Sequence, residues 1–320
     1  MKRLARLVWL VAAVFMGGCD RSFIYYPERL AEARLRPLAQ AAGLEPWTNA
    51  AGERIGWKTP VRPSTARSPR PAVILFHGNA GHAAQRAAYV AGFQRATEPQ
   101  PWPVYLMEYP GYGSRPGEPS EPAFVHAAEE ALAALSPIDH PRVYLAGESL
   151  GSGVACALAA QRPNRVAGLL LVTPFSSLRE VARQHYPGWM VNLLLRERYD
   201  NAATLSRFTG PVAFLLAEND EIVPSELGRK LHDGYTGPKL LRVQADQSHN
   251  TLSFNPTEAW WREVIAFWNG TKNKRALCRK ATRSDDQPVT PAYRWRLPLI
   301  HELRPPHLSP RSLLRPAHES

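Results

Sequence analysis

The residues with the clearest chemical potential form a G-x-S-x-G sequence at positions 147–151, centred on Ser149. An apolar run, 143–146, precedes it, and small residues at 151–155 follow it. This order is typical of a serine held on a sharp turn between a strand and a helix. The flanking glycines allow a tight turn, and a helix N-terminus offers backbone N–H groups to an oxyanion. Ser149 is therefore a candidate nucleophile, although a chance cluster of small turn residues remains an alternative for these five positions alone.

A serine hydroxyl becomes a useful nucleophile when a histidine accepts its proton and a carboxylate orients that histidine. Downstream of Ser149, an apolar run at 211–217 leads into a loop that contains Asp220. A second short run, 240–243, is followed by His249. A strand-to-helix serine of this type is followed along the chain by the acid and then by the histidine. We therefore predict that Asp220 is the acid and His249 the base.

Other interpretations of these loops stay open from the sequence. Glu218 and Glu221 are rival acids on either side of Asp220. Asp220 could instead form an Asx turn or cap the following helix. Asp246 is close enough in sequence to be a further partner of His249, and His249 itself could be an exposed loop histidine.

A third loop is a candidate for the second half of an oxyanion-binding site. The apolar run 72–76 ends in the sequence H-G-N-A-G at residues 77–81. In sites of this kind, one N–H comes from a loop after an early strand and the other from the residue after the nucleophile. We predict that Asn79 and Leu150 supply them. His77 and His82 are expected to be structural, and a plain glycine turn is the alternative for this loop.

Strand-like and helix-like runs alternate along the chain. Helix-like stretches occur at 120–135 and 258–268, and a further strand-like run at 104–108 leads into a second glycine-rich turn. Such alternation predicts an α/β fold with a mostly parallel central sheet and helices on both faces. A length of 320 residues is enough for one large domain of this class.

The chain resembles serine hydrolases of the α/β-hydrolase fold, and within them the small-lid group related to prolyl-oligopeptidase-like and depalmitoylating hydrolases. The resemblance implies a short lid between residues 174 and 211, whose apolar residues either line an acyl pocket or, as we expect for its leucines, pack onto the core. Ala217 departs from the glycine that such proteins often carry before the acid loop. The matching segments follow the family's order between residues 23 and 268: 23–27, 77–81, 109–114, 147–151, 174–178, 220–224 and 248–250.

The formal net charge of +11 is concentrated at the two ends of the chain. Residues 271–320 carry a net charge of +7 and residues 1–18 carry +3, so residues 19–270 are close to neutral. A near-neutral domain has no basic face of the kind that nucleic acids require, so we expect no nucleic-acid partner. Cysteine and histidine show no metal-ligand spacing, no cofactor motif is visible, and Cys156 is expected to be a buried apolar residue.

The N-terminus has basic residues followed by an apolar run, 7–18, that ends at Cys19. Twelve residues are too few to span a bilayer comfortably, so the run predicts an export signal. Residues 16–19 resemble a bacterial lipoprotein box, with Met16 where leucine is usual, which implies cleavage before Cys19 and acylation of its thiol. Asp20 resembles a signal for retention in the inner membrane. A soluble secreted protein and an uncleaved signal anchor are the alternatives.

Together these patterns predict a signal peptide at 1–18, an α/β-hydrolase domain at 19–270 and a disordered Pro/Arg-rich tail at 271–320. The predicted function is a cell-envelope serine hydrolase that cleaves an acyl ester or thioester, uses no cofactor, and binds the membrane through lipidated Cys19. A serine peptidase of related fold and a catalytically silent scaffold are the alternatives. The sequence leaves the oligomeric state open.

Overall fold

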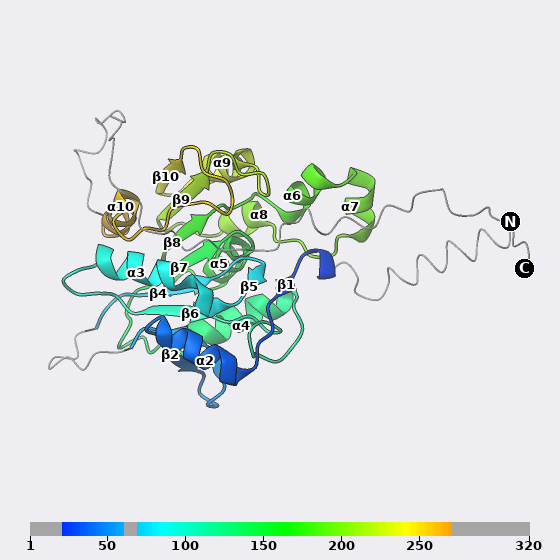
Figure 1. Cartoon of the computed structure of the whole chain (residues 1–320). Helices are drawn as coiled ribbons and strands as arrows, with labels where there is room; N and C mark the ends of the chain where they lie inside the picture. The colour runs from blue at the N-terminus through cyan, green and yellow to red at the C-terminus, as the bar shows by residue number, and fades with distance from the viewer. Residues whose placement is uncertain (1–20, 61–68, 271–320) are drawn as a thin grey trace, which may run out of the picture. The chain divides into compact units, whose positions relative to one another are not determined.

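A central sheet organises the part of the chain that the computed structural model describes, residues 21–60 and 69–270 (Figure 1). Its eight strands have the spatial order β10-β9-β8-β7-β4-β6-β3-β2 within these residues. Strands β4, β6, β7, β8, β9 and β10 run parallel to one another, whereas β3, near one edge, is antiparallel to both of its neighbours, β2 and β6. The strands span Glu45–Thr48 (β2), Arg54–Lys58 (β3), Ala72–Phe76 (β4), Val104–Met107 (β6), Val143–Glu148 (β7), Val166–Val172 (β8), Val212–Ala217 (β9) and Lys239–Gln244 (β10).

Helices cover both faces of this sheet. On one face, buried side chains of α4, α5, α8 and α9 join one hydrophobic cluster, and on the other face those of α2, α3 and α10 join a second. The fold class predicted from the sequence is therefore confirmed. The helices span Glu32–Ala41 (α2), Ala87–Ala96 (α3), Glu121–Ala133 (α4), Leu150–Gln161 (α5), Leu178–His185 (α6), Gly188–Leu194 (α7), Asn201–Leu205 (α8), Ser225–Gly234 (α9) and Ala259–Trp268 (α10).

The central strands are apolar because they are covered on both sides. Every residue of β4 and β9 is buried, which explains why both read as continuous apolar runs and not as alternating patterns. The strands predicted at 72–76, 104–108 and 240–243 are present, with boundaries that differ by one residue or less. Because parallel strands end at the same edge, the loops after β4, β6, β7, β9 and β10 gather there.

Short elements complete the described residues. Two 3-10 helices, η1 (Arg21–Phe23) and η2 (Ala83–Arg86), lie before β1 and α3. Strands β1 (Tyr26–Pro27) and β5 (Ala80–Gly81) form a small parallel pair that joins the N-terminal segment to the 77–81 loop. Within the described residues, no helix is both long and apolar enough to cross a membrane.

The predicted lid consists of α6, α7 and α8. Ser177 caps the start of α6 by accepting a hydrogen bond from the Glu180 N–H. Leu195 packs against the core, but Leu193 is 74% exposed, so the prediction that the lid leucines pack inward is wrong for Leu193. The reason is that α7 is only seven residues long and buries one of them, Val191.

The predictions for the two ends of the chain concern residues that the structure does not describe. These are the signal peptide at 1–18, Cys19 and Asp20, and the tail at 271–320. Contacts divide the chain into Met1–Lys280 and Ala281–Ser320, and the second unit lies wholly outside the described residues.

Candidate active site

Ser149 lies on the tight turn between β7 and α5, as the G-x-S-x-G sequence predicts. Its backbone has φ 50° and ψ −115°, a conformation that non-glycine residues seldom adopt and that is often found at functional sites. The turn is fixed by its N–H, which donates to the Val172 carbonyl at 2.8 Å. A Cβ at Gly147 would lie 2.5 Å from the Gly151 carbonyl oxygen, and one at Gly151 would collide with the Phe76 carbonyl. Both glycines are therefore required for the close approach of helix and sheet.

Asp220 and His249 meet at the same edge of the sheet, from the loops after β9 and β10. The His249 Nδ1 lies 2.7 Å from Asp220 Oδ2. Both side chains are largely buried, with 1% of the Asp220 side chain and 11% of the His249 side chain exposed. The other oxygen of Asp220 accepts hydrogen bonds from the N–H groups of Ile222 (3.0 Å) and Val223 (2.7 Å). Asp220 thus forms the Asx turn considered as an alternative and also holds the histidine.

The rival acids do not occupy this position. Glu218 and Glu221 are exposed, and the Glu218 carboxylate accepts a hydrogen bond from the Asp246 N–H at 3.2 Å. Asp246 is also exposed, and among the described residues the hydrogen-bond partner of the His249 ring is Asp220. The geometry therefore favours Asp220 among the acids that the sequence offered.

His249 also lies near the serine turn. Burial alone would raise the pKa of the Glu148 carboxyl, but the Arg86 guanidinium, with smaller contributions from His77 and His249, holds that pKa below its ordinary value. Glu148 directly precedes Ser149, so His249 is near enough to the turn to act on this carboxyl. Within residues 21–60 and 69–270, no hydrogen bond joins the Ser149 hydroxyl to His249. Catalytic hydrogen bonds are often long without substrate and tighten when it binds.

The 77–81 loop lies against the serine turn. A Cβ at Gly78 would lie 3.7 Å from the Ser149 Cβ and 3.1 Å from Glu148 Oε1, so the glycine permits this approach. Among the hydrogen bonds of the described residues, the backbone N–H groups of Asn79 and Leu150 have no acceptor. Leu150 begins α5, where the N–H groups of the first turn lack a partner in the helix.

Two tyrosines from the glycine-rich loop after β6 hold the backbone of the 77–81 loop. The Tyr109 hydroxyl donates to the His77 carbonyl at 2.9 Å, and the Tyr112 hydroxyl donates to the Asn79 carbonyl at 2.6 Å. Both tyrosines are buried, and burial raises the pKa of each hydroxyl well above its ordinary value, so each stays a donor at neutral pH. His77 and His82 are buried too, in keeping with the structural role predicted for them.

An ion pair that the sequence analysis did not identify links the two halves of the site. Arg86, at the end of η2, binds Glu148 with both arms: Nε to Oε2 at 2.9 Å and Nη2 to Oε1 at 3.0 Å. Only 12% of the arginine side chain and 22% of the glutamate side chain are exposed. The bidentate geometry fixes η2, which follows the 77–81 loop, to the residue before Ser149. One indication of this ion pair was visible in the sequence, an acidic residue inside the G-x-S-x-G motif. The spacing of residues 86 and 148 does not indicate a contact.

Removing this ion pair should lower the stability of the fold. We expect Glu148→Gln to lower the free energy of unfolding at pH 7 by about 3 kcal/mol, the low end for breaking a buried pair. The stabilisation is present above the unfolded pKa of 4.5 and is lost as the pH falls through the lower folded pKa, so the variant and wild type should converge in acid. Urea unfolding between pH 3 and pH 7 measures the difference.

A matched control is the exposed pair of Arg162 and Glu129, 2.9 Å apart. Glu129→Gln should cost less than about 1 kcal/mol, because water screens exposed pairs. Two results would contradict the structural role of the Arg86–Glu148 pair. One is an equal loss of unfolding free energy in the two variants, and the other is a loss in Glu148→Gln that is as large at pH 3 as at pH 7.

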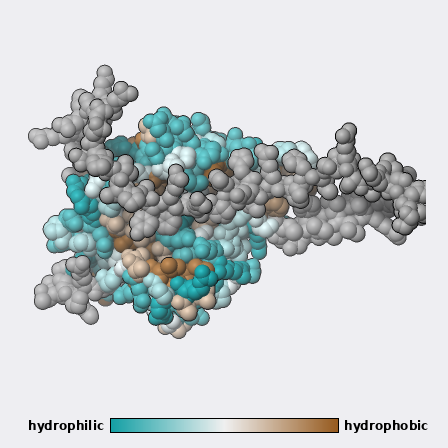
Figure 2. All heavy atoms as spheres, viewed as in Figure 1, coloured by the Kyte–Doolittle hydropathy of each residue, from teal (hydrophilic) through white to brown (hydrophobic). Residues whose placement is uncertain are grey.

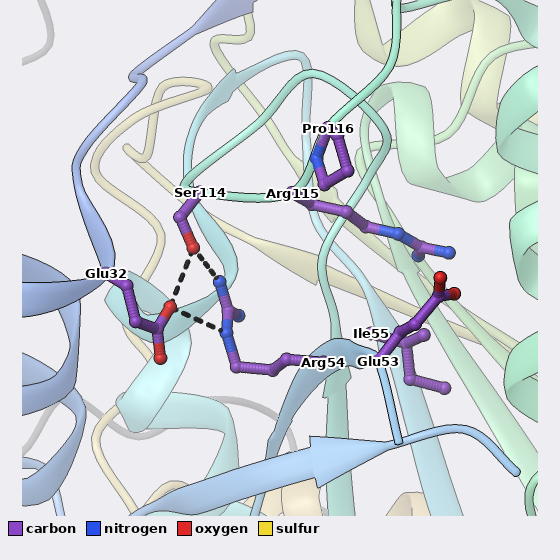
Figure 3. Close-up of a pocket in the computed structure, with 7 residues that line it drawn as sticks. All are labelled: Glu32, Glu53, Arg54, Ile55, Ser114, Arg115 and Pro116. Atoms are coloured by element: carbon purple, nitrogen blue, oxygen red, sulfur yellow. Dashed lines mark hydrogen bonds and ion pairs between the residues drawn. The ribbon is translucent and has the colours of Figure 1, made fainter. Parts of the chain in front are cut away.

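A polar pocket elsewhere at this edge does not contain the predicted site residues (Figure 3). Two of its charged side chains pair with each other: Arg54 Nε binds Glu32 Oε2 at 3.0 Å, and the Ser114 hydroxyl donates to the same oxygen at 2.7 Å. Among the described residues, no group of three or more His, Cys, Asp or Glu side chains is placed to hold a metal ion. The pocket is lined by Glu32, Glu53, Arg54, Ile55, Ser114, Arg115 and Pro116.

Comparison with known proteins agrees with this architecture. The α/β hydrolase fold family matches residues 71–209. An uncharacterised protein of Mycobacterium tuberculosis, Rv2307c, is 34% identical over 257 residues, covering 76% of this chain and 86% of that protein. Rat lysophosphatidylserine lipase ABHD12 is 28% identical, and the match covers 65% of this chain and 56% of the lipase.

Solved structures show the same fold at low identity. Est1E from Butyrivibrio proteoclasticus has a TM-score of 0.55 at 16% identity, and the match covers 71% of this chain and 99% of that one. The Pyrococcus furiosus esterase Pf2001 also has a TM-score of 0.55, at 15% identity, over 77% of this chain and 97% of its own. The resemblance seen in the sequence is thus confirmed at the level of the fold, while the small-lid subgroup stays a prediction. The chain belongs to the α/β-hydrolase family.

Proposed function

We propose that this protein is a serine hydrolase that cleaves an acyl ester or thioester through Ser149, Asp220 and His249. The observation that carries the proposal is the 2.7 Å contact between His249 Nδ1 and the buried Asp220 carboxylate, at the sheet edge where the turn with Ser149 also lies. With Nδ1 held by the carboxylate, Nε2 is left to accept a proton. This arrangement supports a serine nucleophile better than it supports a purely structural role.

In the proposed mechanism, His249 takes the proton of the Ser149 hydroxyl while the oxygen attacks the substrate carbonyl. The N–H groups of Asn79 and Leu150 stabilise the negative charge that forms on the carbonyl oxygen. His249 then gives its proton to the leaving alcohol or thiol, and an acyl-enzyme remains. Water, activated by the same histidine, releases the acyl group and restores Ser149.

The substrate class is proposed from the site and from the relatives together. ABHD12 is named as a lysophosphatidylserine lipase, and such a lipase cleaves an acyl ester. The same chemistry would serve a thioester, and a serine peptidase of related fold remains the enzymatic alternative. Hydrolysis of p-nitrophenyl esters of graded chain length, acyl thioesters and a small peptide library separates these options. The proposal requires the ester or thioester rates to exceed the peptide rates, and faster peptide cleavage would overturn it.

A second part of the proposal concerns location. The run at 7–18 followed by Cys19 supports a lipoprotein whose lipidated Cys19 anchors the domain to the bacterial membrane, and Asp20 supports the periplasmic face of the inner membrane. Two or more acyl chains give stable anchoring, which a single chain does not.

Mass spectrometry of the mature N-terminus tests the anchor. We expect a chain that begins at an acylated Cys19, and a Cys19→Ser variant that carries no lipid and either keeps residues 1–18 or is released from membranes. Cys278→Ser is the control, because Cys278 also lies outside the described residues. This variant should leave the mass of the N-terminal peptide unchanged. An unmodified Cys19, or cleavage elsewhere, would refute the lipoprotein assignment.

A further inference from the structure

Exposed apolar side chains are concentrated at the lid and in the N-terminal segment that contacts it. Six large apolar residues are at least half exposed among the described residues, and four of them belong to α7 and the segments next to it. Trp189 and Leu193 are four residues apart on α7 and therefore lie on the same side of the helix. We call this set the lid face; its members are Phe23 (62% exposed), Tyr186 (52%), Trp189 (69%) and Leu193 (74%).

The N-terminal segment and the lid are held together, so Phe23 belongs with the lid residues. Arg21 forms an ion pair of 3.2 Å with Glu197, just after α7, and the Tyr25 and Tyr199 hydroxyls are 3.0 Å apart. The Tyr26 hydroxyl donates to the Phe23 carbonyl, and its pKa is raised by burial and, to a smaller extent, by the nearby Tyr186. In Figure 1, η1 lies beside α7, where α6 and α7 extend away from the sheet.

We propose that the lid face docks onto a lipid bilayer, an interaction that goes beyond the proposed catalytic function. This docking rests on the proposed N-terminal anchor, which would bring this face to a membrane because the apolar run 7–18 and Cys19 directly precede η1. Phe23 is four positions after Cys19, so the two residues are at most about 14 Å apart. With either anchor, acylated Cys19 or the apolar run, Phe23 would therefore be held close to the headgroup region, where Trp and Tyr side chains are favoured.

Charge and position agree with a lipid partner. Arg179 and Arg183 on α6 both donate to the Asn192 side chain on α7, at 2.8 and 2.9 Å, and among the described residues neither forms an ion pair with an acid. Such arginines attract anionic headgroups. The visible part of the surface in Figure 2 is mostly hydrophilic, with hydrophobic residues in a few patches. A cluster of exposed apolar side chains on such a surface is typical of an interaction site. The His185 ring contacts the Ile222 carbonyl at 2.9 Å, which places this face beside the loop that carries Asp220.

Depth-dependent quenching of tryptophan fluorescence tests the proposal. The full-length chain is reconstituted into vesicles of phosphatidylethanolamine and phosphatidylglycerol that contain phosphatidylcholine brominated near the headgroup end of its acyl chains. The difference between wild type and Trp189→Phe isolates the emission of Trp189 from that of the other eight tryptophans. We expect most of this difference to be lost in brominated vesicles and to be little affected by aqueous iodide.

A matched control uses Ile138, which is 80% exposed in the loop between α4 and β7, at the opposite edge of the sheet. The Ile138→Trp, Trp189→Phe double variant adds the fluorescence of a tryptophan at position 138 to that of Trp189→Phe. This added fluorescence should be quenched by iodide and not by brominated lipid. If Trp189 itself is quenched only by iodide, the lid face is open to water and the proposal is overturned. If neither reagent quenches it, protein covers the face, either another copy or another segment of this chain, and the proposal is overturned as well. Neither result depends on hydrolytic activity, so the proposed catalytic function stands or falls separately.

Discussion

Ser149→Ala and His249→Ala should each lower kcat/KM for ester hydrolysis by about 10⁴-fold or more, and the double variant should lose little beyond that. The reason is that the two groups act in one step. Without the Ser149 hydroxyl, His249 has no proton to accept, and without His249 the hydroxyl is a weak nucleophile. Steady-state kinetics of the three variants on one p-nitrophenyl ester measures this non-additivity.

Ser152→Ala is the control for a serine that lies close to the turn without a proposed catalytic role. Its hydroxyl donates to the Ser149 carbonyl at 2.6 Å and accepts from Asn201 at 3.2 Å. This variant should lose stability more than turnover. Losses that multiply in the Ser149→Ala, His249→Ala variant would show that the two residues act independently, contrary to the mechanism.

Asp220→Asn should lower kcat by roughly 10³–10⁴-fold, while folding is largely kept. An asparagine carbonyl oxygen can still accept the Ile222 and Val223 N–H groups that Asp220 Oδ1 accepts now. The amide NH₂ then faces His249 Nδ1 and can only donate, so the ring is held in the tautomer whose Nε2 carries a proton and cannot accept another. Activity and thermal unfolding, measured on the same preparation, separate the catalytic loss from a loss of fold.

Glu218→Gln and Glu221→Gln are the matched controls in the same loop. Both side chains are exposed, so each variant should change turnover by less than about threefold, as surface substitutions away from the site usually do. If Glu218→Gln proves as damaging as Asp220→Asn, the acid is assigned to the wrong residue.

The framework of the site was predictable because strand ends and loops are local features of sequence. The apolar runs at 72–76 and 211–217 contain the buried strands β4 and β9, and the loops that follow them bring residues 77–81 and Asp220 to one edge of the sheet. The order of serine, acid and histidine along the chain then limits the candidates to a few. Burial and hydrogen bonds separate Asp220 from Glu218 and Glu221, and these depend on how the loop after β9 turns.

Contacts between distant, charged or aromatic residues were not predictable in the same way. Arg86 and Glu148 are 62 positions apart, and neither lies in a pattern that requires a partner. The hydroxyls of Tyr109 and Tyr112 reach the 77–81 loop only because the loops after β4 and β6 are neighbours in the sheet. The exposure of Leu193 was missed because a short apolar run looks the same whether it packs inward or faces a partner.

The most direct test of the central claim is labelling with a fluorophosphonate probe, followed by peptide mass spectrometry. Such a probe reacts covalently with a serine only when a neighbouring base activates the hydroxyl. We predict one adduct, on Ser149, with stoichiometric loss of esterase activity, and no adduct in Ser149→Ala or His249→Ala. An adduct on another residue, or hydrolysis that persists after Ser149 is fully labelled, would contradict the account.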